Sequence, residues 1–356
     1  MTTTTDAVAG VPDRWRTVDL DAWTRHVVRR HFDPATGSPY WLKRATELSF
    51  DPRDITAYDE LAALGGTDPR GVDPVDLLPQ DGPVAPAGRL WESTGTLGGT
   101  CRFVHTASMT HHREHWRARH LRTAGFVPGR VWLRVCPGGP HALGRGGGQL
   151  ARHHRSRVHT VGIDQRWIRR LLRDGRVGGI NAYVDHVVGQ VVDLLETQRV
   201  DYLETAPAVL AVLLAHRPDL VGRLAGVDLV GTHLTPQTYR DVVAALDGGV
   251  VGHRWVGAAG HAIGLPVHDD GALMPYLPAY PQVTMAVVDP ADPARVVGYG
   301  ELGRLRLTVL HEDLFLPNVL HRDQALRYRT SAGWPCDGVA NVAPLQAMLA
   351  LPTGLY

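Results

Sequence analysis

Apolar positions along this chain follow two spacings, which predict two kinds of element. A spacing of three to four residues predicts helices at residues 18–33, 107–124, 183–199, 207–216 and 235–246. Short apolar runs predict strands at residues 131–135, 200–206, 228–232, 283–289 and 303–310. Asp19 or Asp21 is suited to cap the first helix. Strands that alternate with helices predict an α/β class with a largely parallel sheet, and the strand-rich last third predicts an antiparallel or barrel-like element beside it.

Composition and charge add a broad class to this pattern. The chain has 356 residues, of which 44% are hydrophobic and 21% are charged, with a net charge of +1. This balance predicts a soluble globular protein and gives no electrostatic reason to expect nucleic acid or a membrane as partner. The first ten residues lack the basic and apolar regions of a signal peptide. Three cysteines lie outside any CxxC pair and are expected to be reduced thiols, which favours a cytoplasmic location.

The segment from Glu92 to Thr100, ESTGTLGGT, is the strongest local signal for chemistry. Its glycines allow backbone N–H groups to turn inward, and its hydroxyls add neutral donors for phosphate oxygens. It is not a Walker loop, because no Gly-Lys-Ser/Thr ends it. The alternative is an ordinary turn between a strand and a helix. The candidate phosphate-binding residues are Ser93, Thr94, Gly95, Thr96, Gly98 and Thr100.

This segment resembles the Ser/Thr/Gly phosphate loop of the adenylate-forming superfamily, which includes acyl-CoA ligases, and especially its phenylacetate-CoA-ligase-like members. Later segments resemble that family's landmarks in consistent order at residues 137–144, 228–240, 253–261, 297–310 and 316–328. Within the superfamily, the chain most resembles proteins linked to phenazine (griseoluteic acid) antibiotic biosynthesis and aryl carboxylate reduction. The stretches that carry this likeness are YVDHVVGQVVDLLETQ, VDPADPARVVGYGELG, LPNVLHRD and CDGVANVAP.

The resemblance covers residues 20–345 and implies a fold. We expect a large domain of the adenylate-forming type at residues 16–345, built from two α/β subdomains and a β-barrel-like element. It implies a disordered tail at 1–15, a C-terminal tail at 346–356, and no small C-terminal domain.

The resemblance also implies ATP and Mg²⁺ as cofactors and assigns roles to residues. Asp323, in an Arg-Asp pair, corresponds to the aspartate that holds the ribose hydroxyls. The adenine-binding positions are Gly231, Thr232, His233, Trp255, Val256 and Gly257. The substrate-binding positions are Gly139, His141, Ala258, Ala259 and Gly260.

The implied reaction is adenylation of a small aromatic carboxylic acid in secondary metabolism. A partner protein would then reduce the acyl group or transfer it, and a homodimer is an open expectation. The sequence departs from the family at Ala259, where a threonine is usual, and at Gly260, where a glutamate linked to magnesium is usual. The phosphate loop lacks its usual lysine, and the family's catalytic lysine has no counterpart here. These departures keep open a nucleotide-binding protein with weak or no catalysis, a pseudoenzyme or scaffold.

A rival interpretation comes from the predicted helix at 107–124. His111, Glu114 and His115 fit the HxxEH pattern of inverted zinc peptidases. A polar helix face in a chain with 19 histidines explains the same match without a metal. Trp116, Trp132 and Trp167 fall at apolar positions and are expected in the core.

Overall fold

The computed structural model describes Trp15 and residues 17–80, 86–92, 101–231, 234–257, 260–265, 267, 271–331 and 334–345. One sheet of eleven strands runs through it, in the order β10-β11-β12-β13-β9-β8-β7-β6-β5-β3-β4. The tails predicted at 1–15 and 346–356 lie outside the described residues, apart from Trp15. None of the helices in these ranges combines the length and the apolar character that crossing a bilayer needs.

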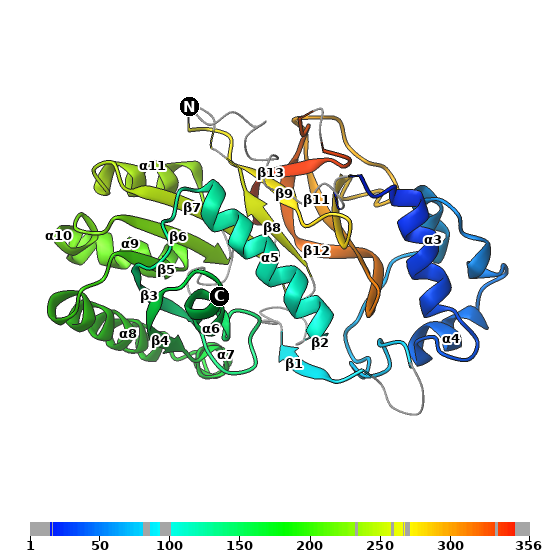
Figure 1. Ribbon diagram of the computed structural model, residues 1–356, viewed down its shortest axis with the longest axis horizontal. Coiled ribbons are helices and arrows are strands. Elements are labelled where there is room, and N and C mark those ends of the chain that lie inside the picture. The colour runs from blue at the N-terminus through cyan, green and yellow to red at the C-terminus, as the bar shows by residue number, and fades with distance from the viewer. Residues whose placement is uncertain are drawn as a thin grey trace.

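Five strands at one end of the sheet run parallel to one another. They are β7 (Val250–Val256), β6 (Gly226–Gly231), β5 (Tyr202–Thr205), β3 (Val131–Pro137) and β4 (Arg157–Ile163). Helices cover this half (Figure 1). They are α6 (Gly146–His153), α7 (Gln165–Arg173), α8 (Val177–Thr197), α9 (Pro207–His216), α10 (Pro218–Val221) and α11 (Pro236–Ala245). The mixed α/β class is confirmed.

The two faces of this parallel half differ because side chains alternate along each strand. Leu133, Leu203 and Val227 face α7, α8, α9 and α11 in one apolar cluster. Trp132 and Tyr202 face the other side, where they pack with residues of α5 and α6. This second face also carries charged residues, which are described with the functional site.

Six antiparallel strands continue the same sheet. They are β8 (His261–Gly264), β9 (Pro275–Pro278), β13 (Gly338–Pro344), β12 (Leu314–Tyr328), β11 (Leu302–His311) and β10 (Val283–Val288). This half curls, because β10 also contacts β12, β13 and β9. A separate barrel-like element stays a prediction; in the described residues these strands share their sheet with the parallel half.

The N-terminal helices pack on the antiparallel half. They are α3 (Leu20–His31), α4 (Pro39–Ala45) and two 3₁₀ turns, Pro52–Asp54 and Tyr58–Leu64. Asp19 caps α3, since its carboxylate accepts the Ala22 N–H at 2.7 Å. Val28 and Trp41 join Phe315 of β12 in one apolar cluster, and the Trp41 indole donates to the Phe315 carbonyl at 2.9 Å.

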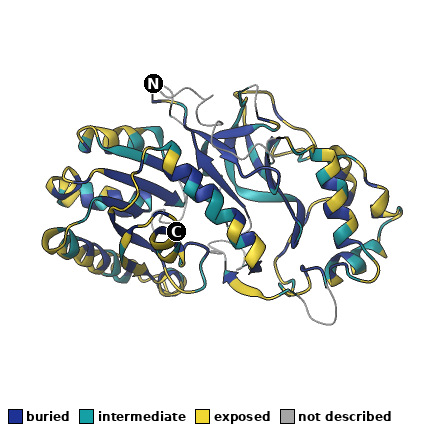
Figure 2. Cartoon of the chain, viewed as in Figure 1, coloured by how far each residue is buried: buried dark blue, intermediate teal, exposed yellow. Residues whose placement is uncertain are grey.

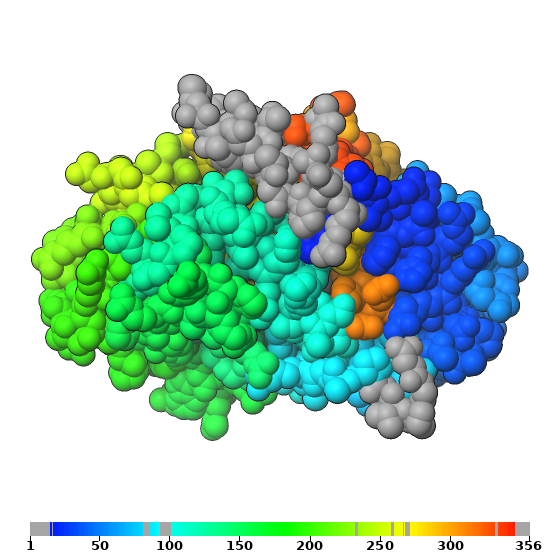
Figure 3. Space-filling model, in the orientation of Figure 1, coloured from blue at the N-terminus to red at the C-terminus, as the bar shows by residue number. Residues whose placement is uncertain are grey.

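A hairpin and a long helix connect these two ends. β1 (Gly88–Glu92) pairs with β2 (Arg102–Thr106), so residues 93–101 join the two strands. Helix α5 (Ala107–Thr123) follows, capped by the Thr106 hydroxyl, which accepts the Met109 N–H. It crosses the middle of the molecule in front of the sheet (Figures 1 and 3). Exposed residues lie near its two ends, and its middle is buried or half-buried (Figure 2).

Two of the three tryptophans expected in the core are there. Trp116 and Trp132 are fully buried. The prediction for Trp167 is wrong, because its side chain is 41% exposed on α7, where the Arg170 guanidinium lies 5.8 Å from its ring. Ile168 and Leu171 carry the apolar face of that helix instead.

Candidate nucleotide and acid site

The carboxyl ends of parallel strands β6 and β7 bring together two residues predicted to bind adenine. Gly231 ends β6 and is the cross-strand partner of Trp255 on β7. Gly231 has φ +110°, a backbone conformation that favours glycine, at the point where the chain leaves the sheet. Ligands of open α/β sheets bind outside such carboxyl ends. Thr232 and His233, which follow directly, lie outside the described residues.

Trp255 also meets Asp323, the predicted ribose-binding residue. Its indole N–H donates to Asp323 Oδ2 at 3.0 Å, and His321 Nδ1 lies 3.2 Å from the same oxygen. Asp323 Oδ1 has no hydrogen bond within the described residues, which leaves it free to accept from a ligand. Burial raises the pKa of Asp323, but His321 and the hydrogen bonds from His321 and Trp255 outweigh it, so its pKa lies below the usual value.

The conformation of Trp255 bears on its predicted role. Its side chain is only 3% exposed, and a Cβ atom on Gly257 would lie 2.7 Å from the ring. The indole therefore lies against Gly257, just beyond the end of β7, and its N–H is bonded to Asp323. Stacking of Trp255 on adenine stays a prediction. Val256, the next residue, is half-buried and packs with Leu143 and Val230.

His141 lies where the predicted phosphate loop begins. It forms a parallel bridge with Glu92, the last described residue before that loop, and the Glu92 N–H donates to the Pro140 carbonyl at 2.8 Å. His141 Nδ1 accepts the Leu143 N–H at 3.2 Å, so the proton of the neutral ring is on Nε2. Burial, with Arg113 and Arg169 nearby, lowers the pKa of His141 to about 4. At neutral pH this side chain is an uncharged donor.

The other end of the predicted phosphate loop lies against β12, the strand that carries Asp323. Cys101, which follows the loop, packs against the apolar cluster that holds Leu314 and Leu316 of this strand. Burial lowers the pKa of Arg322, and the neighbouring Asp323 carboxylate opposes this shift. The six phosphate-binding residues predicted between 93 and 100 are themselves outside the described residues.

Two further substrate positions have a described environment. Gly139, in the loop after β3, has φ +60° and is exposed. A Cβ on Gly260 would face Val283 at 3.4 Å and Leu307 at 3.6 Å, so this position is in apolar surroundings. The residues present therefore do not supply a carboxylate for magnesium at position 260. Ala258 and Ala259 lie outside the described residues.

A buried network of charges beside this edge was missed by the sequence analysis. Glu204 of β5 is fully buried and accepts hydrogen bonds from Arg117 of α5 and from Arg134 of β3, the latter at 3.0 and 3.1 Å. Arg254 Nη2 of β7 lies 3.2 Å from its Oε1. Burial raises the pKa of Glu204, but the three guanidinium groups outweigh it, so the carboxyl stays ionised.

Asp228 of β6 extends the network. It accepts from Arg254 at 2.9 and 3.0 Å, and its Oδ1 lies 2.7 Å from His120 Nε2 of α5. The sequence held a signal for this network. Residues 113, 117 and 120 are spaced to share one face of α5, and each facing strand has one or two charged residues among apolar ones.

The zinc interpretation finds no support in the described residues. His111 is exposed, and His115 packs edge-on against Trp15 with ring centroids 4.5 Å apart. Glu114 instead pairs with His153 at 2.8 Å and Arg152 at 3.6 Å. Within the described ranges no three His, Cys, Asp or Glu side chains gather as a metal site would require.

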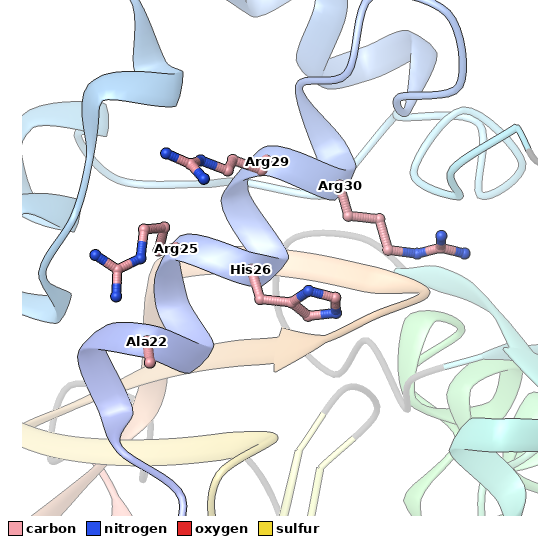
Figure 4. A pocket seen from close by; sticks show the side chains of 5 residues that line it. All are labelled: Ala22, Arg25, His26, Arg29 and Arg30. Atoms are coloured by element: carbon pink, nitrogen blue, oxygen red, sulfur yellow. The ribbon is translucent and has the colours of Figure 1, made fainter.

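A shallow hollow on α3 lies far from this edge. Arg25, Arg29 and Arg30 line it, but they point to different sides of the helix (Figure 4). Arg30 is engaged elsewhere, since its Nε donates to the Glu312 carbonyl at 2.8 Å. These side chains do not converge on a common point, so the hollow is a surface feature and not a competing site.

Comparison with solved structures identifies the fold. The open conformation of 2-hydroxyisobutyryl-CoA ligase, in complex with 2-HIB-AMP and CoA, has a TM-score of 0.64 and 14% sequence identity over 90% of this chain and 67% of that chain. The same enzyme in its thioesterification state has a TM-score of 0.62 and 13% identity over 94% and 69%. No protein-family model and no curated protein sequence matches this chain. The chain therefore shares the fold of about two thirds of an acyl-CoA ligase.

Proposed function

We propose that this protein binds ATP at the carboxyl edge of β6 and β7 and activates a small carboxylic acid as its acyl-adenylate. The observation that carries the proposal is the contact between Trp255 and Asp323, with Cys101 packed against β12 at one end of the loop and Glu92 against His141 at the other. Two segments assigned to one nucleotide from the sequence thus lie together. The shared fold with a ligase whose structures hold an acyl-adenylate and CoA supports the same reaction class.

In the proposed reaction a carboxylate oxygen of the acid attacks the α-phosphorus of ATP. A C–O–P linkage forms, the bond from the α-phosphorus to the bridging oxygen breaks, and pyrophosphate leaves with that electron pair. Catalysis of this kind depends on positioning and charge stabilisation. Asp323 Oδ1 would accept from a ribose hydroxyl, and His141 Nε2–H would donate to the acid. The hydroxyls between Ser93 and Thr100 would hold the outer phosphates.

The proposal gives no residue of this chain the role of a magnesium ligand. Mg²⁺ neutralises phosphate charge when it is bound with ATP. Because Gly260 stands in apolar surroundings in place of a carboxylate, such an ion would be held by phosphate oxygens and water and not by position 260. We assign no step to it.

We further propose a small aromatic acid as substrate, in secondary metabolism, on the resemblance of the sequence to phenazine-linked proteins. The acyl-adenylate would pass to a partner enzyme that supplies a hydride, a thiol or an amine. A homodimer belongs to the same proposal. These refinements rest on the sequence resemblance.

ATP–pyrophosphate exchange across a panel of aryl acids tests the proposed reaction. Exchange that depends on one acid, and that falls in Asp323→Asn, would support it. Absence of exchange together with measurable ATP binding would favour the second candidate, a nucleotide-binding protein without turnover. Two observations favour this second candidate. Position 260 has no carboxylate, and the Trp255 indole already donates to Asp323 Oδ2.

A further inference from the structure

A half-buried arginine on α5, Arg113, has no acidic partner among the described residues. No atom among the described residues accepts a hydrogen bond from Nη1 of Arg113, although this nitrogen is fully buried. Its guanidinium lies 4.9 Å from the Trp91 ring, which supplies a cation–π contact but no countercharge. Burial, with Arg254 and Arg117 acting in the same direction, lowers the pKa of Arg113 to about 9, so it is still protonated at neutral pH.

The charge around Arg113 does not balance. Within the part of the chain that the structure describes, Arg117, Arg134 and Arg254 share two buried carboxylates, Glu204 and Asp228, and Arg113 adds a fourth cation that pairs with neither. Burial lowers the pKa of His120 despite its contact with Asp228, so this histidine adds no fixed charge. A surplus of positive charge in a buried site is unfavourable unless an anion joins it.

A cavity lies at the position of the surplus. Arg113, Arg254 and His261 line it, together with Ala142 and Val256. The cavity has a volume of about 30 Å³, enough for a small polar group and too small for an aromatic ring. His261 Nε2 is also buried without a hydrogen-bond partner among the described residues.

The cavity adjoins the proposed substrate site on two sides. Ala142 follows His141, the proposed donor to the acid, and Val256 follows Trp255. We infer that Arg113 and the cavity that it lines form an oxyanion site, which binds a small carboxylate or phosphate group. A guanidinium fork matches either oxyanion with paired hydrogen bonds. On the proposed function, this group is a second acidic substituent of the acid substrate, and a phosphate of ATP is the other source.

Calorimetric titration of the full chain tests the site without any need for catalysis. The probes are isophthalate, benzoate, inorganic phosphate and ATP. The variants are Arg113→Gln and, as a matched control, Arg122→Gln, which changes an exposed arginine on the same helix. We expect isophthalate and phosphate to bind the wild type and Arg122→Gln, and to bind Arg113→Gln at least about tenfold more weakly. Benzoate, which has one carboxylate, should lose little in either variant.

The four probes distinguish the two possible sources of the oxyanion, the acid substrate and ATP. A loss confined to isophthalate and phosphate indicates the acid, whereas an equal loss for ATP indicates the nucleotide. Equal affinity of wild type and Arg113→Gln for all four probes would overturn the inference. If Arg113→Gln does not fold, thermal unfolding of the wild type replaces it, since isophthalate or phosphate should raise Tm where benzoate does not, and no such difference would overturn the site.

Failure of this site is distinguishable from failure of the proposed function. Exchange with monocarboxylic acids, without any dependence on Arg113, would keep adenylation and remove the oxyanion site. Binding of isophthalate that depends on Arg113, without exchange for any acid, would keep the site and remove adenylation.

Discussion

The indole of Trp255 donates a hydrogen bond to Asp323 over 3.0 Å, although their strands lie in different halves of the sheet. Trp255 is on β7, in the parallel half, and Asp323 is on β12, in the antiparallel half, with β8, β9 and β13 between them. Trp255 belongs to the same apolar cluster as Met285 and Leu307 of the antiparallel half. The curl of the sheet therefore creates the contact on which the proposed nucleotide site depends.

Trp255→Phe should lower the free energy of unfolding by about 1.5–3 kcal/mol. The ring would still fill its place in the core, but the buried carboxylate of Asp323 would lose a hydrogen bond, and bonds to charged groups are worth this amount. Urea unfolding measures the change. Trp167→Phe, at an exposed position, is the control and should cost less than about 0.5 kcal/mol. An equal effect of the two substitutions would show that the contact with Asp323 contributes nothing.

Gly146→Ala should destabilise the protein by about 2–4 kcal/mol. A methyl group at this position would overlap the Arg134 guanidinium and lie 2.7 Å from Arg117 Nη1, so both ion pairs with Glu204 would have to shift. Gly147→Ala, one residue further along the same helix, meets nothing closer than 3.5 Å. Thermal or urea unfolding of this pair should show loss for the first variant and no loss for the second, and similar values would argue against a rigid arginine cluster.

Stability should fall as the pH is lowered from 6.5 to 4, before most carboxylates are protonated. Burial lowers the pKa of His253 from 6.5 to about 4, with a smaller effect of His120 in the same direction. Across this window the unfolded chain holds a proton on His253 that the folded chain does not, so acid favours unfolding. For this one residue the loss approaches about 3 kcal/mol near pH 4.

The slope of stability against pH can be assigned with two variants. Urea unfolding of His253→Phe should show a shallower fall between pH 6.5 and 4 than the wild type. His216→Phe changes an exposed histidine and should leave the slope as it is. A wild-type stability that stays flat over this range would contradict the buried neutral state of His253.

Most helices and strands of this fold could be predicted from the sequence, because helical and strand spacings are local properties. The helix predicted at 107–124 is α5, and the strand predicted at 131–135 is β3. Trp167 was misjudged because an apolar residue type does not reveal which way a short helix faces. The order of strands, and the curl that joins β7 to β12, depend on contacts between residues far apart and could not be predicted from spacing.

The candidate site likewise has a part that the sequence could suggest and a part that it could not. Gly231, Trp255 and Asp323 could be proposed because they stand in segments that resemble known motifs, and the fold brings these three together. The cluster around Glu204 was missed, since a lone charge in an apolar strand looks like an interruption when its partners are unknown. Only the fold shows that α5 faces those strands and that Arg113 pairs with no acidic side chain in the described ranges.

The dissociation constant of ATP tests the central claim most directly, when it is measured for the wild type, Thr96→Val and Asp323→Asn. Asp241→Asn, an exposed carboxylate on α11, serves as control. We predict that Thr96→Val and Asp323→Asn each weaken ATP binding by at least about tenfold and that the control does not change it. ATP affinity that is the same in all four proteins would contradict the account, because the phosphate loop and Asp323 would then not share a nucleotide.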